Sequence, residues 1–289
     1  MDKLKLLELQ KKATIIRKYI IDEVFSANSG HPGGSLSCTD ILTTLYFDEM
    51  RVRPTEPRWA DRDRFVLSKG HCAPALYATL AVAGFFPEAD LNTFRRIDSY
   101  LEGHPSMNYV PGVDMSTGSL GQGISTAVGM ALAGKIDKKD YRVYSILGDG
   151  ELEEGLVWEA AMSAAHYKLD NLCAFVDFNG LQIDGKITDV MNPEPIADKF
   201  AAFGWNVIEV DGHDICAIKG AIETAKTVKG KPTMVVCHCH KGHGVSFMED
   251  QYGWHGKAPN QEQRDQAIAE LDAKLAEINA EIAKAKEAK

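Results

Sequence analysis

The sequence has no excess of positive charge, no long apolar run and no paired-cysteine motif. Its 289 residues carry 32 Lys and Arg against 41 Asp and Glu, a net charge of −9. This acidic balance argues against nucleic acid or an anionic membrane as the main partner. No stretch of about 18 apolar residues occurs, so the sequence predicts no membrane span.

The amino-terminal and cysteine patterns indicate a reducing compartment. The first segment, MDKLKLLELQKKATIIRKYI, is amphipathic and of mixed charge, and it lacks the apolar core and cleavage site of a signal peptide. The six cysteines form no Cys-x-x-Cys pair and show no spacing of a small disulfide-bonded domain. We therefore expect a cytoplasmic protein.

Neither an internal repeat nor a low-complexity linker divides the chain, and 45% apolar residues are enough for a large core. We expect a single domain over residues 1–289, with a C-terminal helix at about 261–289. The apolar residues of this tail alternate spacings of three and four, which gives a narrow seam of Ile268, Leu271, Leu275, Ile278 and Ile282. The seam favours a helix laid on its own domain over a contact between subunits.

Apolar runs that read as strands alternate with helical patterns. Helices are predicted at 4–25, 39–46, 122–134, 155–169 and 215–228, with a Gly- and Ser-rich loop at 26–38. Strands are predicted near 65 and at 141–147, 171–178, 205–210 and 232–238, each apolar on both faces. This order predicts an α/β fold with a doubly wound, mostly parallel sheet flanked by helices. Ligands bind such sheets at the carboxyl ends of the strands.

The stretch GDGELEEG (148–155) crowds carboxylates at the end of a predicted strand. Such crowding costs energy unless water reaches the charges or a cation lies among them. Asp149 stands at the strand end between two glycines, which allow close backbone approach. The N-terminus of the following helix favours the binding of an anion such as a diphosphate. The Asp149 carboxylate can bind near a diphosphate only if a hard cation such as Mg²⁺ lies between them. The remaining acids are expected to face solvent or an interface: Glu151, Glu153, Glu154 and Glu159.

Asn179 ends the next predicted strand, in AFVDFNGLQIDG. Neighbouring parallel strands would bring Asp149 and Asn179 together, so that two side-chain oxygens and a loop carbonyl can bind one metal ion. Gly-Asp-Gly followed by Asn at about this distance resembles the fingerprint of thiamine diphosphate enzymes. The predicted cofactors are thiamine diphosphate and Mg²⁺, with Mn²⁺ or Ca²⁺ able to take the place of Mg²⁺.

Most of the nine histidines lie beside glycine. The motifs are SGHPGG (His31), SKGHCAP (His71), EGHPSM (His104), KGHG (His243) and GWHGKAP (His255). Together with STGSLGQG (116–123), they resemble transketolase, and the resemblance covers essentially the whole chain. The deoxyxylulose-phosphate synthases are less similar around His104 and GSLGQG.

The resemblance implies a thiamine diphosphate-binding fold and specific residue roles. Asp149, Asn179 and the backbone carbonyl of Leu181 would bind Mg²⁺. The cofactor-binding residues would be His71, Gly118, Leu120, Gly150, Glu154, Asn179 and His255. The catalytic residues would be His31, His71, His104 and His255, since imidazole both donates and accepts protons near neutrality. Glu154 resembles the family's glutamate at the interface between subunits.

Two positions depart from the family pattern. Phe178 stands where the family often has Asp before the metal-binding Asn, and His243 has no assigned role. The run CHCHKGH (237–243) resembles a zinc site in composition. On a strand, however, Cys237 and Cys239 point to one face and His238 and His240 to the other. Zinc ligands must converge, so a strand end is the favoured interpretation.

No segment resembles the family's pyrimidine-binding domain or its C-terminal domain. In the family, the pyrimidine-binding domain supplies the acid that contacts the pyrimidine ring of the cofactor. The resemblance is to the N-terminal subunit of a split, two-chain transketolase, which moves a two-carbon ketol unit between sugar phosphates in the pentose phosphate pathway. We expect the chain to be inactive alone and to need a C-terminal partner subunit, two copies of each forming an α2β2 heterotetramer. The alternatives are a subunit of a deoxyxylulose-phosphate synthase-like or other thiamine-dependent enzyme, and a non-catalytic regulatory homologue.

Overall fold

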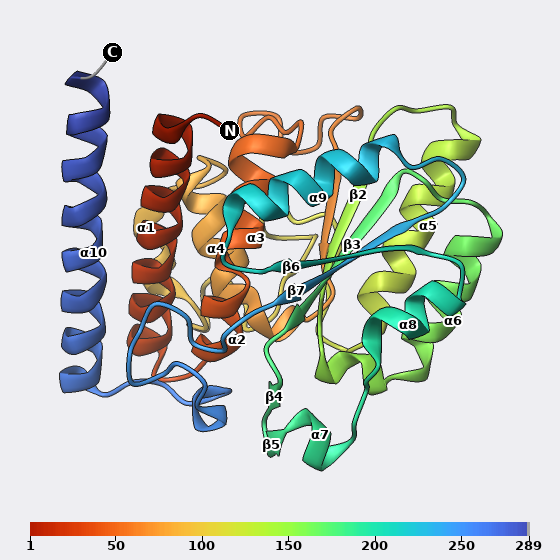
Figure 1. Ribbon diagram of the computed structural model, residues 1–289. Coiled ribbons are helices and arrows are strands. Elements are labelled where there is room, and N and C mark those ends of the chain that lie inside the picture. Colours follow the sequence, from red (N-terminus) through yellow and green to blue (C-terminus); the bar gives the residue numbers. More distant parts are fainter. Residues whose placement is uncertain (288–289) are drawn as a thin grey trace.

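The computed structural model describes residues 1–287 and is organised around a five-stranded parallel sheet (Figure 1). The strand order is β1 (Arg64–Leu67), β2 (Val143–Gly148), β3 (Leu172–Phe178), β7 (Thr233–His238) and β6 (Asn206–Asp211). Every neighbouring pair is parallel. The predicted α/β fold is confirmed, and all five predicted strands are found.

Helices cover both faces of the sheet, because successive strand residues point to opposite sides. Phe65 and Leu67 of β1 enter one core and Val66 enters the other. The first face carries α1 (Lys3–Ala27), α2 (Pro32–Ser37), α3 (Thr39–Thr44), α4 (Ala73–Val82), α9 (Ile215–Thr227) and α10 (Gln261–Glu287). The second carries α5 (Gln122–Ile136), α6 (Gly155–His166) and α8 (Ile196–Ala202). Figure 1 shows the two groups on either side of the strands.

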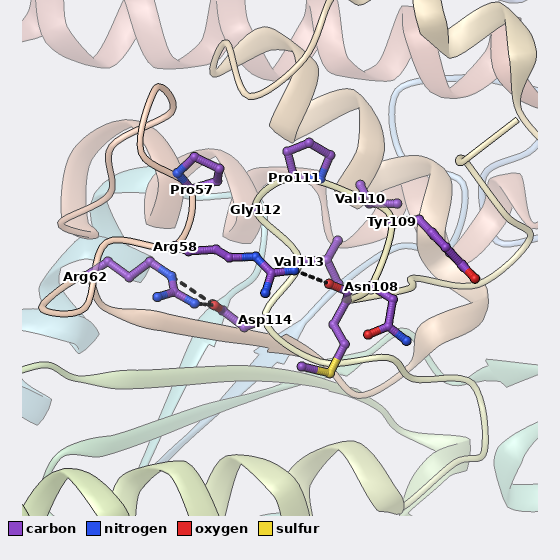
Figure 2. Close-up of a pocket in the computed structure, with 11 residues that line it drawn as sticks. Pro57, Arg58, Arg62, Asn108, Tyr109, Val110, Pro111, Gly112, Val113 and Asp114 are labelled. Atoms are coloured by element: carbon purple, nitrogen blue, oxygen red, sulfur yellow. Dashed lines mark hydrogen bonds and ion pairs between the residues drawn. The ribbon is translucent and has the colours of Figure 1, made fainter.

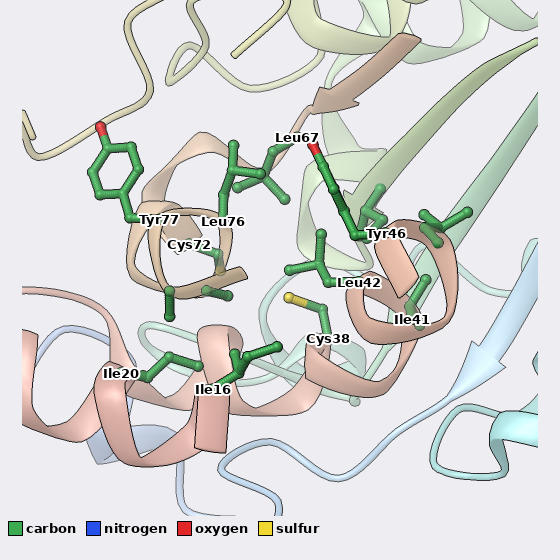
Figure 3. Close-up of a cluster of buried hydrophobic side chains, with 14 of the residues drawn as sticks. Ile16, Ile20, Cys38, Ile41, Leu42, Tyr46, Leu67, Cys72, Leu76 and Tyr77 are labelled. Carbon is green, nitrogen blue, oxygen red and sulfur yellow. The ribbon is translucent and has the colours of Figure 1, made fainter. Parts of the chain in front are cut away.

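The core of the first face reaches directly to one of the predicted site loops. Side chains of α1, α3 and α4 interdigitate there, with Cys38 and Cys72 among them (Figure 3). Tyr77 of α4 is fully buried, and its hydroxyl donates to the backbone carbonyls of Glu102 and His104, at 2.9 and 3.0 Å. The packed helix thus fixes the loop that carries His104.

Short elements fill the carboxyl end of the sheet. After β3 the chain forms a hairpin of β4 (Leu181–Gln182) and β5 (Gly185–Lys186), followed by α7 (Ile187–Val190). Turns of 3₁₀ helix lie at η2 (Gly70–Cys72), η3 (Glu88–Thr93), η4 (Gly150–Glu153) and η5 (Tyr252–Trp254), and a π turn, η1 (Leu45–Glu49), follows α3. Two of these turns, η2 and η4, directly follow β1 and β2, where ligands of such sheets bind.

Four sequence-based expectations about these elements were wrong in part. The loop expected at 26–38 contains the helix α2, and the helix expected at 39–46 ends as α3 at Thr44 and continues as a π turn. The helix expected at 155–169 ends at His166. The strand expected at 205–210 exists as β6, but it lies at the edge of the sheet and is only partly buried, with Glu209 exposed. Edge strands lack a covering neighbour on one side, which explains the exposure.

The expected C-terminal helix is present as α10 and packs along α1 of the same chain (Figure 1). Leu271 and Ile278 are 2% and 4% exposed, and Ile282 is also buried. Residues 288 and 289 of the predicted helix lie outside the described part of the chain. Over residues 1–287, no helix combines the length and apolar character that crossing a bilayer requires.

Candidate cofactor and catalytic site

Asp149 and Asn179 follow neighbouring strands, β2 and β3, as the sequence predicts. Asp149 is 3% exposed, and its two carboxylate oxygens accept the backbone N–H groups of Gly150 at 2.8 Å and Gly180 at 2.6 Å. The second bond joins the two strand ends. Burial, aided by repulsion from Asp177, raises the pKa of Asp149 to about 6. A buried carboxylate of this kind is stabilised by a nearby cation.

Leu181 lines the same cavity, and its backbone carbonyl contacts a positively charged side chain. The ammonium group of Lys241 donates to Leu181 O over 3.1 Å, and its charge also acts on Asp149. Together with the Asn179 amide, these groups provide carboxylate, carbonyl and amide oxygens, the donors that Mg²⁺ prefers. The residues predicted as ligands therefore fit a hard divalent cation.

Asp177 on β3 orients the Asn179 side-chain amide by accepting a hydrogen bond from it. Asp177 is fully buried; one of its oxygens accepts from Ser37 Oγ at 2.5 Å, from Asn179 Nδ2 at 3.2 Å and from Lys69 Nζ. Burial opposes ionisation, but Lys69 and the hydrogen bonds outweigh it and lower the pKa of Asp177. Because the amide nitrogen is held by this carboxylate, Asn179 Oδ1 is turned away from it, where it accepts from Leu181 N at 3.2 Å.

Glu151 corrects the expectation that the other acids of 148–155 face solvent. It is 2% exposed, and its carboxylate accepts from Ser68 Oγ at 2.5 Å, Gly121 N at 2.9 Å and Gly148 N at 3.0 Å. Glu151 therefore ties together the ends of β1 and β2 and the start of α5. The three acids expected on the surface besides it, Glu153, Glu154 and Glu159, are exposed.

Four histidines from separate segments meet beside these strand ends. The ring of His31 lies 5.2 Å from that of His71, 5.5 Å from that of His255 and 6.4 Å from that of His104, between centroids. His71 and His255 stack at 5.1 Å. Close packing at Gly33 permits this arrangement, since a Cβ there would lie 2.9 Å from the carbonyl of Trp254. The structure thus brings together all four residues predicted as catalytic.

Desolvation keeps three of these four imidazoles neutral near pH 7. It is the main cause that lowers the pKa of His31 to about 4 and that of His255 to about 3. It also lowers the pKa of His104, with His71 and Arg95 contributing. The Nδ1 atoms of His31 and His255 are buried without a hydrogen-bond partner in the described chain. Neutral rings with free polar atoms suit the binding of a polar ligand.

Six of the seven predicted cofactor-binding residues line a cavity of about 280 Å³ at the carboxyl edge of the sheet. The lining includes His71, Gly118, Leu120, Asp149, Gly150, Asn179, Leu181 and His255. Gly118 has φ +152°, and a Cβ there would lie 2.9 Å from the His104 ring. Glycine is therefore required where this loop crosses His104. Glu154 does not line the cavity; it is exposed beside Gly121.

The sequence analysis missed three buried residues of this site. Lys69 and Lys241 are 1% and 2% exposed and line the cavity, and Asp177 lies beneath it. Both lysines stand within histidine motifs, SKGH and HKGHG, and Asp177 is the one charge within an apolar strand. A charge inside a predicted buried strand is a signal of a paired group.

The run 237–243 forms a strand end, as favoured, and its cysteines and histidines do not converge. Cys237 and Cys239 are buried, whereas His238 and His240 are exposed and pair with Glu209 and Asp250, at 2.9 and 3.0 Å. His243 lies further on, against His213, with ring centroids 3.6 Å apart.

A second cavity lies between the segments 57–62 and 107–114 and contains none of the predicted site residues (Figure 2). The Arg62–Asp114 ion pair closes one side, and Arg58 donates to the carbonyl of Met107 at 3.5 Å. It is a surface feature distinct from the histidine cluster.

Comparison with known proteins agrees with this geometry. The family model "Transketolase, thiamine diphosphate binding domain" matches residues 9–288. This chain belongs to the transketolase family. It is 47% identical over 266 residues to the 6-deoxy-6-sulfo-D-fructose transketolase subunit SqwG of a Clostridium species, covering 92% of this chain and 97% of the relative.

Other transketolases match at similar levels. A subunit of the apulose-4-phosphate transketolase of Phocaeicola vulgatus is 44% identical over 275 residues, covering 95% of this chain and 97% of the relative. The crystal structure of Campylobacter jejuni transketolase superposes with a TM-score of 0.86 at 33% identity, covering 99% of this chain but 48% of that chain. The chain thus corresponds to the thiamine diphosphate-binding domain of transketolase, and it has about the length of the two relatives named as subunits.

Proposed function

We propose that this chain is the N-terminal, thiamine diphosphate- and Mg²⁺-binding subunit of a two-chain transketolase that transfers a two-carbon ketol unit from a ketose phosphate to an aldose phosphate. The observation that carries the proposal is the convergence of Asp149, Asn179 and the Leu181 carbonyl in one cavity beside four histidines. Proximity of a hard-cation donor set to imidazoles suits a diphosphate cofactor and proton transfer to sugar hydroxyls.

Each residue has a role set by its place in the cavity. Asp149, Asn179 and the Leu181 carbonyl hold Mg²⁺, while His71, Gly150 and His255 hold the diphosphate. Gly118 and Leu120 contact the pyrimidine side of the cofactor. When bound, thiamine diphosphate supplies the reactive thiazolium carbon that takes up the two-carbon unit. His31, His71, His104 and His255 orient the sugar hydroxyls and exchange protons with them, for which a neutral imidazole offers both a donor and an acceptor atom.

The chain is proposed to act with a second, C-terminal subunit in an α2β2 assembly. Two relatives that it matches along 97% of their length are named as transketolase subunits. Full-length transketolases are covered only to about half, as in the 44% of the orangutan enzyme. The cavity rim supports a partner as well, because Ile183 is 59% exposed there. An exposed apolar side chain at a site rim is typical of a surface that another chain covers.

The direct test is ketol transfer with Mg²⁺ and thiamine diphosphate, run with the chain alone and with its cognate C-terminal subunit. Ribose 5-phosphate serves as acceptor, and xylulose 5-phosphate, fructose 6-phosphate and 6-deoxy-6-sulfofructose as donors, the last because of the named relative. Activity in the mixture only is expected. Turnover by the chain alone contradicts the need for a partner, and turnover with pyruvate as the donor indicates a synthase-like enzyme instead.

Asp149→Ala tests cofactor binding separately from turnover. The change removes the buried carboxylate of the proposed metal site, so calorimetry of the two-chain complex should show at least about a hundredfold loss of thiamine diphosphate affinity with Mg²⁺. The exposed Asp198→Ala, on α8, is the control and should bind like wild type. Unchanged binding by Asp149→Ala places the cofactor elsewhere and favours a non-catalytic role for this cavity.

A further inference from the structure

The segment 240–243, which follows β7, reaches the proposed cofactor site from one side. Lys241 Nζ donates to the carbonyl of Leu181 at 3.1 Å, and Gly242 N donates to the carbonyl of Gly33 at 2.9 Å. Gly33 lies two residues after His31. The position of this short segment therefore bears on both the proposed metal ligand and the histidine cluster.

On its other side, both ends of the same segment are hydrogen-bonded to a series of connected polar side chains: Arg17, Asp40 and His213. Arg17 of α1 pairs with Asp40 of α3 through two bonds, of 2.5 and 3.3 Å. Asp40 Oδ2 lies 2.9 Å from His213 Nδ1, and His213 Nε2 accepts the backbone N–H of His240 at 2.9 Å. Arg17 Nε donates to the carbonyl of His243 at 3.1 Å, which closes the ring.

The contacts among these three side chains fix the charge of Asp40 and the position of the ring proton of His213. Arg17 and Asp40 are 6% and 4% exposed. Burial opposes ionisation of Asp40, but Arg17 and His213 outweigh it and lower its pKa to about 2. Since His213 Nε2 accepts a backbone N–H, its ring proton lies on Nδ1 and is donated to Asp40. Both nitrogens of His213 are therefore used.

A metal ion does not explain the cluster. Asp40, His213 and His243 offer donor atoms within 4.8 Å of one another. However, the rings of His213 and His243 stack at 3.6 Å with an interplanar angle of 19°, so their in-plane lone pairs do not converge on one point. His243 also directs Nδ1 to Glu249 at 2.7 Å. The arrangement serves to hold backbone.

We propose that Arg17, Asp40 and His213 form a positioning relay that fixes the 240–243 segment and, through Lys241, sets the Leu181 carbonyl for Mg²⁺ and thiamine diphosphate. None of the three residues lines the cofactor cavity, so they act through the segment and touch neither cofactor nor substrate. The inference rests on the proposed function of that cavity. It gives a role to the DGH sequence at 211–213, which no motif of the family resemblance includes.

Two substitutions at His213 separate its contact with Asp40 from its contact with the backbone N–H of His240. In His213→Asn the amide stands near the Nδ1 position and keeps the contact with Asp40, but it is too short to reach His240 N. In His213→Gln the amide extends to about the Nε2 position and can accept the His240 N–H. His238→Gln is the matched control, because exposed His238 ends β7, just before the 240–243 segment, and its ring nitrogen Nε2 pairs with Glu209 and not with the relay.

The measurements are hydrogen–deuterium exchange of the 239–250 peptide and calorimetric binding of thiamine diphosphate with Mg²⁺, both on the two-chain complex. His213→Asn should speed exchange of this peptide and weaken cofactor binding about tenfold or more, as loss of an outer support of a metal ligand does. His213→Gln should restore most of the affinity, and His238→Gln should match wild type. The KM for the sugar donor should stay unchanged in all three.

The outcomes separate this inference from the proposed function. If Asp149→Ala loses cofactor binding while His213→Asn keeps it, the relay is refuted and the proposed site stands. If His213→Asn and His213→Gln lose stability and affinity equally, the histidine only supports the fold and the inference is again refuted. A wild-type complex that binds no thiamine diphosphate overturns both.

Discussion

At the scale of single residues, burial decides what a charge does in this protein. Lys69 is buried but pairs with Asp177, and Arg17 is buried but pairs with Asp40, so that each cation is matched by a carboxylate. Glu23 of α1 has no such partner. It is 1% exposed, and neither of its carboxyl oxygens accepts or donates a hydrogen bond within the described chain. An unpaired buried carboxyl weakens a fold.

Glu23→Met is therefore expected to stabilise the protein. Burial, with repulsion from Asp22, raises the pKa of Glu23 well above 4.5, so the native state keeps a proton that the unfolded chain releases as pH rises above that value. Glu23 alone therefore lowers the free energy of unfolding as pH rises above about 5, and Glu23→Met removes this contribution. The gain in stability of Glu23→Met over wild type should grow with pH and reach about 1–3 kcal/mol at pH 8.

Urea unfolding followed by circular dichroism across this pH range measures both effects. Glu8→Met is the control on the same helix, because Glu8 has a side chain 41% exposed and a long ion pair with Lys286, at 3.7 Å. It should change stability by less than about 0.5 kcal/mol. A Glu23→Met protein that is less stable than wild type at every pH would mean that the carboxyl is satisfied.

At the scale of elements, apolar periodicity correctly predicted the helices and strands whose formation depends on their own local sequence. The strands before Asp149 and Asn179 and the long helices α1 and α10 follow from apolar spacing alone. The short helix α2 did not, because its sequence PGGSLS contains poor helix formers. It is held by tertiary contacts, including the bond from Gly242 N to the Gly33 carbonyl.

Long-range contacts also explain what the sequence analysis misjudged within the site. Glu151 is buried because Ser68, 83 residues away in the chain, and Gly121 donate to it. The exposure of β6 depends on its place at the end of the strand order, which no local pattern encodes. The predicted ligands and histidines did converge, since all of them follow strand ends or glycine loops at one edge of a parallel sheet.

The contact between α10 and α1 gives a prediction at this scale. Leu271 is 2% exposed and packs into the core of the first face, whereas Leu275, one turn further on, is only partly buried. Leu271→Ala should lower the free energy of unfolding by about 2–4 kcal/mol, because it leaves a cavity. Leu275→Ala changes the helix propensity equally and should cost less than about 1 kcal/mol. Chemical denaturation of both variants checks this, and equal losses would show that the packing of α10 on α1 is not the source of its stability.

At the scale of the whole molecule, several separated segments build one open cavity. His104 and Ile183 are exposed at or near its rim, and Glu154 is exposed beside Gly121, close to the loop that carries Leu120. The chain therefore presents the proposed metal site and the histidine cluster on one side of this cavity, with a surface around it that a second chain can cover. The proposed partner supplies the acid for the pyrimidine ring, for which the predicted site residues of this chain offer no candidate.

Glu154 should lie in that contact between the two chains. Glu154→Lys reverses a charge at the start of α6, and a misplaced charge at an interface costs several kcal/mol, so association with the C-terminal subunit should weaken at least about tenfold. Glu262→Lys is the matched control, because it makes the same change at an exposed position in the first turn of α10 and carries the same unfavourable interaction with a helix dipole. Sedimentation velocity of each variant mixed with the partner measures assembly, and thermal unfolding of the isolated chain checks that both variants are folded. If Glu154→Lys assembles as wild type does, Glu154 lies outside the contact, and the partner must approach the cavity from the side of Ile183 and His104.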